Sequence, residues 1–137
     1  MTPKKMIGIV IITHGELCTE FVETAKRIGV ESKNIETISL SPSEGLDDLS
    51  LKISQAIKKV DKGKGVVLLT DLLHGSCSKV AGEFLAQDEI EVICGVNLPM
   101  IISLVSHQNW DIHQAVQKAK ESSIKSIVDL RERLKGE

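Results

Sequence analysis

Apolar and polar positions follow one another in blocks that predict alternating strands and helices. Residues 6–13 are almost wholly apolar and rich in isoleucine, which is typical of a strand buried on both faces of a parallel sheet. Between residues 16 and 28 the apolar positions fall on one helical stripe that ends at Gly29, which predicts an amphipathic helix. Three shorter strands are predicted at residues 35–40, 66–70 and 90–94.

Helical periodicity fills the intervals between these runs. Residues 44–60 carry an apolar stripe, and Asp47 and Asp48 suit the positive end of the helix dipole. Pro99 favours the first turn of a later helix, and Asp111 is a suitable N-cap for the helix after it. Further helices are therefore predicted at about residues 76–87, at 99–107 and from 112 onward.

The last segment of the chain leaves two interpretations open. In the first, residues 124–134 extend the preceding helix, whereas in the second, residues 124–129 form a final strand. Periodicity does not separate the two interpretations, because a short apolar run fits both.

Strands that alternate with helices predict an α/β fold. We expect a mostly parallel four-stranded sheet with right-handed crossovers, helices on both faces and the strand order 2-1-3-4. Ligands in such folds bind beyond the carboxyl ends of the strands where the order reverses, which here lies between the first and third strands. A length of 137 residues predicts a single domain over residues 1–137.

Composition and charge argue against several classes of protein. A net charge of −2 argues against a nucleic-acid binder, and the apolar run of residues 7–12 is too short to cross a bilayer. The same run lacks the small-residue cleavage site of a signal peptide, so we expect a cytoplasmic protein. Cys18, Cys77 and Cys94 show no metal-ligand spacing, and His74 with Cys77 lacks further matching ligands, so no metal and no cofactor are expected.

Two polar residues follow the strands that this order makes neighbours. His14 ends the first strand and Asp71 follows the third. An imidazole is a nucleophile near physiological pH if one nitrogen is held as N–H and the other presents its lone pair. Asp71 is placed to accept that N–H, to select the tautomer and to stabilise the cation that forms. The pair predicts phosphoryl transfer through His14.

Groups that bind phosphate flank this pair. A helix is predicted to begin just after each of the two loops, and free N–H groups at a helix start bind phosphate oxygens. Gly15 and Gly75 permit close approach of the backbone, and the hydroxyls of Thr13 and Ser76 are further donors. Phosphoryl transfer depends mainly on such positioning and charge stabilisation.

Three segments of the chain share their order and spacing with a known family. They are residues 7–15, which end in Thr13-His14-Gly15, residues 65–76, which contain Asp71 and Ser76, and Gly95-Val-Asn-Leu-Pro-Met100. In these segments, and over nearly its whole length, the chain resembles the enzyme IIA components of the mannose/fructose/sorbose class of the bacterial phosphotransferase system (PTS).

The resemblance implies a relay between proteins. His14 would accept phosphate from phosphohistidine on HPr, the general phosphocarrier, and donate it to a IIB domain, which phosphorylates a sugar entering through a membrane IIC/IID complex. Asp71 would hold the imidazole, and Ser76 would lie beside the phosphate. Members of the family form homodimers that exchange a C-terminal strand, which favours a strand at residues 124–129.

The active-site loop departs from the family pattern. His74 replaces the first of two glycines, Cys77 replaces a proline, and Leu72 stands where threonine is common. His74 either adds a donor to the phosphate or is an exposed loop residue, and we favour the second interpretation. An alternative function is a regulatory protein that is phosphorylated at His14 and signals through a partner instead of serving transport.

Overall fold

Four parallel strands form the centre of the fold, in the order β2-β1-β3-β4. The computed structural model describes residues 5–31 and 33–136. The strands are β1 (Gly8–His14), β2 (Ile35–Leu40), β3 (Val66–Thr70) and β4 (Ile90–Cys94). This order confirms the predicted topology and places the end of β1 beside the end of β3.

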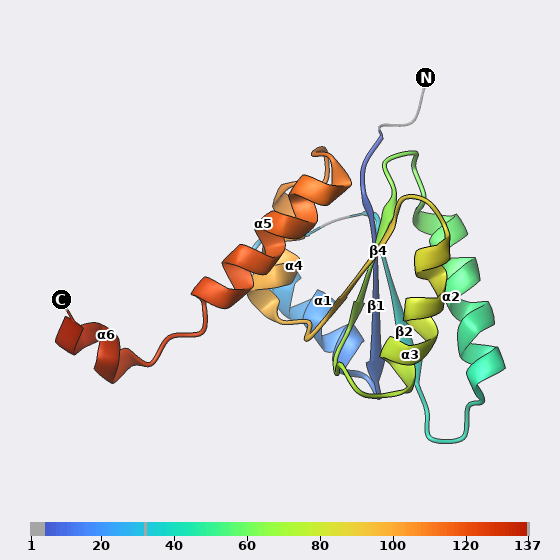
Figure 1. Ribbon diagram of the computed structural model, residues 1–137, viewed down its shortest axis with the longest axis horizontal. Coiled ribbons are helices and arrows are strands. Elements are labelled where there is room, and N and C mark those ends of the chain that lie inside the picture. Colours follow the sequence, from blue (N-terminus) through green and yellow to red (C-terminus); the bar gives the residue numbers. More distant parts are fainter. Residues whose placement is uncertain (1–4, 32, 137) are drawn as a thin grey trace.

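Helices cover both faces of the sheet (Figure 1). One face carries α1 (Leu17–Arg27), α4 (Leu98–Ser106) and α5 (Ile112–Lys125). The other face carries α2 (Leu46–Val60) and α3 (Ser76–Glu83), which continues into a 3₁₀ turn at Phe84–Ala86. Within residues 5–31 and 33–136, no helix combines the length and apolar character needed to cross a membrane.

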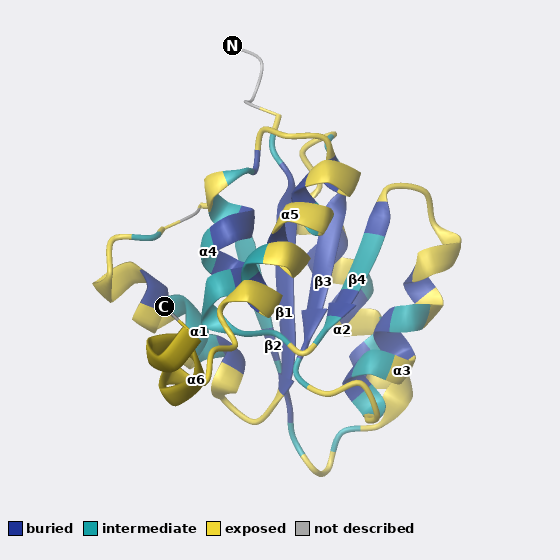
Figure 2. Ribbon diagram, turned by 60° about the vertical axis from the view of Figure 1, so that its left-hand side comes forward, coloured by how far each residue is buried: buried dark blue, intermediate teal, exposed yellow. Residues whose placement is uncertain are grey.

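The apolar run of β1 is explained by burial on both of its faces. Ile9 and Ile11 pack with α1, α4 and α5, whereas Val10 and Ile12 pack with α2 and α3, and all four side chains are fully buried. Figure 2 shows the central strands buried and the outer faces of the helices exposed. Continuous burial holds β1 rigidly, so the residue at its carboxyl end has a defined position.

The N-cap predicted at Asp111 is confirmed. Its Oδ2 accepts hydrogen bonds from the main-chain N–H groups of His113 at 3.0 Å and Gln114 at 3.3 Å. The carboxylate thus satisfies two of the free donors at the start of α5 and complements the helix dipole.

The C-terminal segment differs from both sequence interpretations. The helix α5 continues to Lys125, and after residues 126–129 a separate helix, α6 (Leu130–Gly136), begins. The strand favoured for residues 124–129 is not formed in this chain, because Ile124 and Lys125 already belong to α5 and the N–H groups of Ser126 and Ile127 donate back into its last turn. Figure 1 shows α6 projecting away from the sheet and its helices.

Candidate functional site

The structure brings His14 and Asp71 together at the carboxyl end of the sheet. Ile12 lies opposite Thr70 in the sheet register, so the residues that follow on each strand emerge side by side. The Oδ2 atom of Asp71 accepts a hydrogen bond from the main-chain N–H of His14 at 2.9 Å and lies 3.0 Å from its ring Nδ1. The other carboxylate oxygen accepts from the N–H of Leu72 at 2.9 Å.

Electrostatics determine which ring nitrogen of His14 is free. Partial burial acts to raise the pKa of Asp71, but the hydrogen bonds from the main chain and ring of His14 outweigh it and lower that pKa below its ordinary value. Asp71 is therefore a carboxylate at neutral pH and only accepts hydrogen bonds, so Nδ1 of His14 must carry the hydrogen. In the neutral ring the lone pair then resides on Nε2. The His14 side chain is 46% exposed, against 11% for Asp71.

The start of α3 lies against the imidazole. A β-carbon placed on Gly75 would lie 3.3 Å from Cε1 and 3.8 Å from Nε2 of His14, so the absent side chain lets the backbone approach the ring. The first intrahelical hydrogen bond of α3 runs from Lys79 N–H to the carbonyl of Gly75. The N–H groups of Ser76, Cys77 and Ser78 precede that bond, and such groups at a helix start are donors for an anion.

The start of α1 offers less to an anion than the sequence predicts. Thr13 is fully buried, and its hydroxyl accepts from Cys18 N–H at 2.8 Å and donates to the carbonyl of Gly15 at 3.3 Å. Gly15 adopts φ +59°, and its N–H donates to the carbonyl of Leu40. The geometry therefore favours Thr13 and Gly15 as residues that shape the turn after His14, rather than as open phosphate donors.

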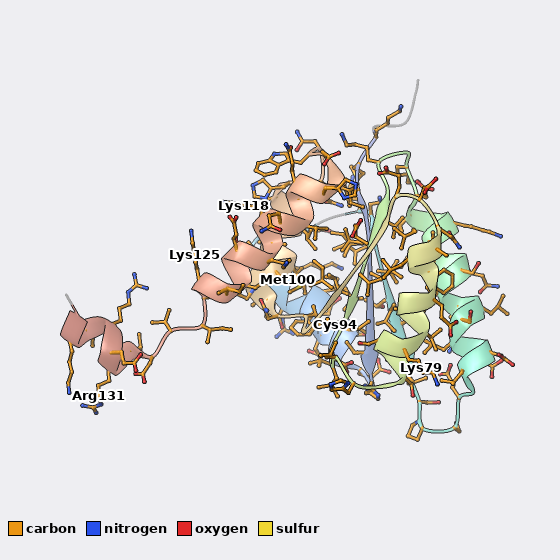
Figure 3. The ribbon with its side chains drawn as sticks, viewed as in Figure 1. Lys79, Cys94, Met100, Lys118, Lys125 and Arg131 are labelled. Atoms are coloured by element: carbon orange, nitrogen blue, oxygen red, sulfur yellow. The ribbon has the colours of Figure 1, made fainter. Side chains whose placement is uncertain are left out.

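The two remaining predicted residues border a groove beside the site. His74 is exposed, and with Ser76 and Lys79 it lines a groove whose apolar wall includes Leu73 and Leu85. Lys79 lies on α3 toward the same end of the sheet as the strand ends (Figure 3). His74 and Ser76 thus bring polar side chains, and Lys79 a positive charge, to the rim of this groove.

Cys77 places a buried thiol close to His14 and Asp71. One nitrogen of His14, one oxygen of Asp71 and the sulfur of Cys77 lie within 4.8 Å of one another, which is a spacing that can hold a metal ion. Burial, with smaller contributions from Asp71 and Cys18, raises the pKa of the Cys77 thiol to about 11. A protonated thiol is a poor ligand and a poor nucleophile.

A further polar residue, Ser78, connects three segments at this end of the sheet, and the sequence pattern did not predict it. Its hydroxyl contacts the hydroxyl of Thr70 at 2.6 Å, the sulfur of Cys94 at 3.3 Å and the carbonyl of Leu72. A serine in the first turn of a helix is common as a solvated residue, so its type and position alone do not distinguish it.

Comparison with known proteins identifies the family. Residues 8–128 match the protein family described as PTS system fructose IIA component. The chain belongs to this family. Among its relatives, the PTS sorbose-specific EIIA component of Lacticaseibacillus casei is 30% identical over 124 residues, which cover 87% of this chain and 89% of the relative.

Another relative of this IIA component is longer than the matching region. The PTS mannose-specific EIIAB component of Escherichia coli (strain K12) is 34% identical over 106 residues, which make up 77% of this chain and 33% of the relative. The chain thus spans about a third of the length of that relative.

Solved structures share the fold of this IIA component. The phosphotransferase system component EIIA from Streptococcus agalactiae superimposes with a TM-score of 0.83 at 24% identity, over 92% of this chain and 98% of that one. The mannose/sorbose specific IIA subunit from Enterococcus faecalis gives 0.81 at 18% identity, over 90% and 94%. The α/β architecture is therefore common to proteins whose sequences have diverged widely.

Proposed function

We propose that this IIA component is a cytoplasmic phosphocarrier. His14 accepts a phosphoryl group from phosphohistidine on HPr and passes it to a IIB domain, which serves sugar uptake through a IIC/IID complex. The observation that carries the proposal is the contact of Asp71 Oδ2 with both the main-chain N–H and Nδ1 of His14. This contact directs the lone pair of the imidazole to Nε2, the position from which it can attack phosphorus.

The proposed transfer balances as an exchange of one N–P bond for another. Nε2 of His14 forms a bond to phosphorus while the bond to the donor histidine breaks, and the donor nitrogen leaves with the electron pair. The ring of His14 retains its Nδ1 hydrogen and becomes cationic, a change that the carboxylate of Asp71 stabilises. The free N–H groups at the start of α3 and the hydroxyl of Ser76 bind the phosphoryl oxygens, with Gly75 allowing their approach.

Exposed leucines beside His14 support a protein rather than a small molecule as the phosphoryl donor. Leu17, Leu72 and Leu73 are 47%, 56% and 67% exposed, and they stand within three residues of His14 or Asp71 in the chain. Apolar side chains around an exposed reactive group are typical of a docking surface for another protein. The same surface serves both the donor HPr and the acceptor IIB, since each must reach the same nitrogen.

A labelling experiment tests the proposal directly. The chain is incubated with enzyme I, HPr and labelled phosphoenolpyruvate, and the modified atom is identified by mass spectrometry and NMR. We expect acid-labile label on Nε2 of His14, which a subsequent addition of IIB removes. Absence of label would refute the phosphocarrier function, and label that IIB cannot remove would favour the regulatory alternative.

Truncating the docking surface is expected to weaken recognition of the donor. A Leu73→Ser variant should raise the KM for phosphorylated HPr about 10-fold, which corresponds to about 1.4 kcal/mol for one apolar contact, and leave kcat nearly unchanged. Steady-state transfer rates against HPr concentration measure both constants. Leu51→Ser is the matched control, since Leu51 is 58% exposed on α2, and an equal effect there would contradict the assignment of the surface.

We propose a homodimer formed through the C-terminal segment. Ile127, Leu130 and Leu134 are 82%, 69% and 76% exposed, and such side chains beyond the end of α5 favour burial against a second copy. An Ile127→Ser, Leu134→Ser double variant is expected to sediment as a monomer where the parent chain sediments as a dimer. Ile28→Ser, at an exposed position after α1, serves as the control, and a monomeric parent chain would refute the proposal.

A further inference from the structure

Ser78 occupies a junction of three segments at the carboxyl end of the sheet. Its hydroxyl reaches Thr70 at the end of β3, Cys94 at the end of β4 and the carbonyl of Leu72 in the active-site loop. Thr70 and Cys94 lie opposite each other in the sheet register, so both point their polar atoms to one place. Figure 3 shows Cys94, together with Lys79 of α3, toward this end of the sheet.

The three contacts use the full capacity of the Ser78 hydroxyl. A carbonyl oxygen only accepts, so the single hydrogen of Ser78 must be donated to Leu72. Thr70 and Cys94 then donate their own hydrogens to the two lone pairs of the Ser78 oxygen. Because the side chain of Thr70 is fully buried, loss of its partner would leave a buried hydroxyl unsatisfied.

Leu72 links this junction to the reactive histidine. Its carbonyl is held by Ser78, while its N–H donates to Oδ1 of Asp71 at 2.9 Å. The two peptide groups on either side of the Leu72 α-carbon are therefore both held, which restrains the loop and with it the carboxylate of Asp71. That carboxylate in turn fixes the ring of His14 through Oδ2.

We propose that Ser78 is a positioning residue for phosphoryl transfer, which holds the loop after β3 so that Asp71 keeps His14 in the tautomer that reacts. The inference rests on the proposed function of His14. Ser78 acts through Leu72 and Asp71, in the way that outer hydrogen-bond partners orient a catalytic or metal-binding imidazole and change activity without touching the substrate.

The decisive variant is Ser78→Ala, read by two independent measurements. We expect the rate of His14 labelling to fall on the order of 10-fold, as is usual when an outer partner of a functional histidine is removed. We also expect ¹⁵N NMR of the unphosphorylated chain to show a larger population with hydrogen on Nε2 of His14. The second measurement needs no partner protein, so it reports on Ser78 even if the proposed function of His14 fails.

Two further variants separate positioning from general destabilisation. Ser78→Thr retains the hydroxyl and is expected to restore both the rate and the tautomer of the parent chain. Ser106→Ala removes a helix serine that donates to the carbonyl of Ile102 at 2.7 Å on α4, and it should change neither measurement. A parental tautomer and labelling rate in folded Ser78→Ala would overturn the inference, as would failure of Ser78→Thr to restore them.

Discussion

A His14→Ala variant is expected to take up no label above background from phosphorylated HPr. The physical reason is that His14 combines an exposed ring with a carboxylate partner that fixes its tautomer and stabilises the cation. Asp71 is committed to two N–H donors at one oxygen, and burial keeps Cys77 protonated with a pKa of about 11. The measurement is the incorporation of label from phosphoenolpyruvate through enzyme I and HPr, followed by mass spectrometry of the intact chain.

The chain offers a close control for this variant. His113 also faces a carboxylate, with its Nδ1 3.4 Å from Glu91, but it lies in the first turn of α5, remote in sequence from the loops that follow β1 and β3. A His113→Ala variant should label as fully as the parent chain. If His14→Ala retained label while keeping its fold by circular dichroism, the assignment of the phosphoryl acceptor would be wrong.

An Asp71→Asn variant is expected to label on the order of 100-fold more slowly. An amide has one accepting oxygen and one donating NH₂ group, whereas the carboxylate accepts at both oxygens. In one orientation the NH₂ group opposes the N–H of Leu72, and in the other it opposes the N–H of His14 and favours hydrogen on Nε2. The second orientation disfavours the reactive tautomer, and the first sets two N–H donors against each other at Leu72, which disturbs the loop. In both orientations the amide no longer offsets the charge that develops on the ring.

Single-turnover labelling rates measure this effect, and Asp111→Asn controls for the loss of one negative charge. Asn is as good an N-cap as Asp, so α5 should begin as before and the labelling rate should be parental. Equal rates for Asp71→Asn and the parent chain would contradict the role of Asp71 in orienting His14, and would leave the acceptor role of His14 itself intact.

The lowered pKa of Asp71 also predicts how the free energy of unfolding of Asp71→Asn depends on pH. A carboxyl group with a lowered folded-state pKa stabilises the native state above its ordinary value of 3.8, and this contribution is lost as the pH falls through the lowered value. The difference in free energy of unfolding between the parent chain and Asp71→Asn should therefore be constant near neutral pH and shrink in acid. Urea unfolding at several pH values measures it.

The strands were predictable because their signal is local. The strands predicted at residues 35–40, 66–70 and 90–94 coincide with β2, β3 and β4. The continuous apolar run of β3 suits a strand buried on both faces, whereas β2 and β4 lie at the sheet edges, are partly buried and include polar residues. Helix ends were less well predicted. The helix expected at about residues 76–87 ends at Glu83 and tightens into a 3₁₀ turn, because the geometry of its last turn depends on packing against β4 rather than on local propensity.

By itself, the sequence determined the order of the elements. That order places His14 and Asp71 side by side, at the point where the strand order reverses. Only the tertiary structure decided which ring nitrogen is free, because that depends on an oxygen 57 residues away in the chain. It also decided that the hydroxyl of Thr13 bonds to Cys18 and Gly15 within the turn, and that the hydroxyl of Ser78 donates to the carbonyl of Leu72. Residue types and spacing specify which elements form, whereas hydrogen-bond partners depend on register and side-chain direction, which exist only once the elements pack.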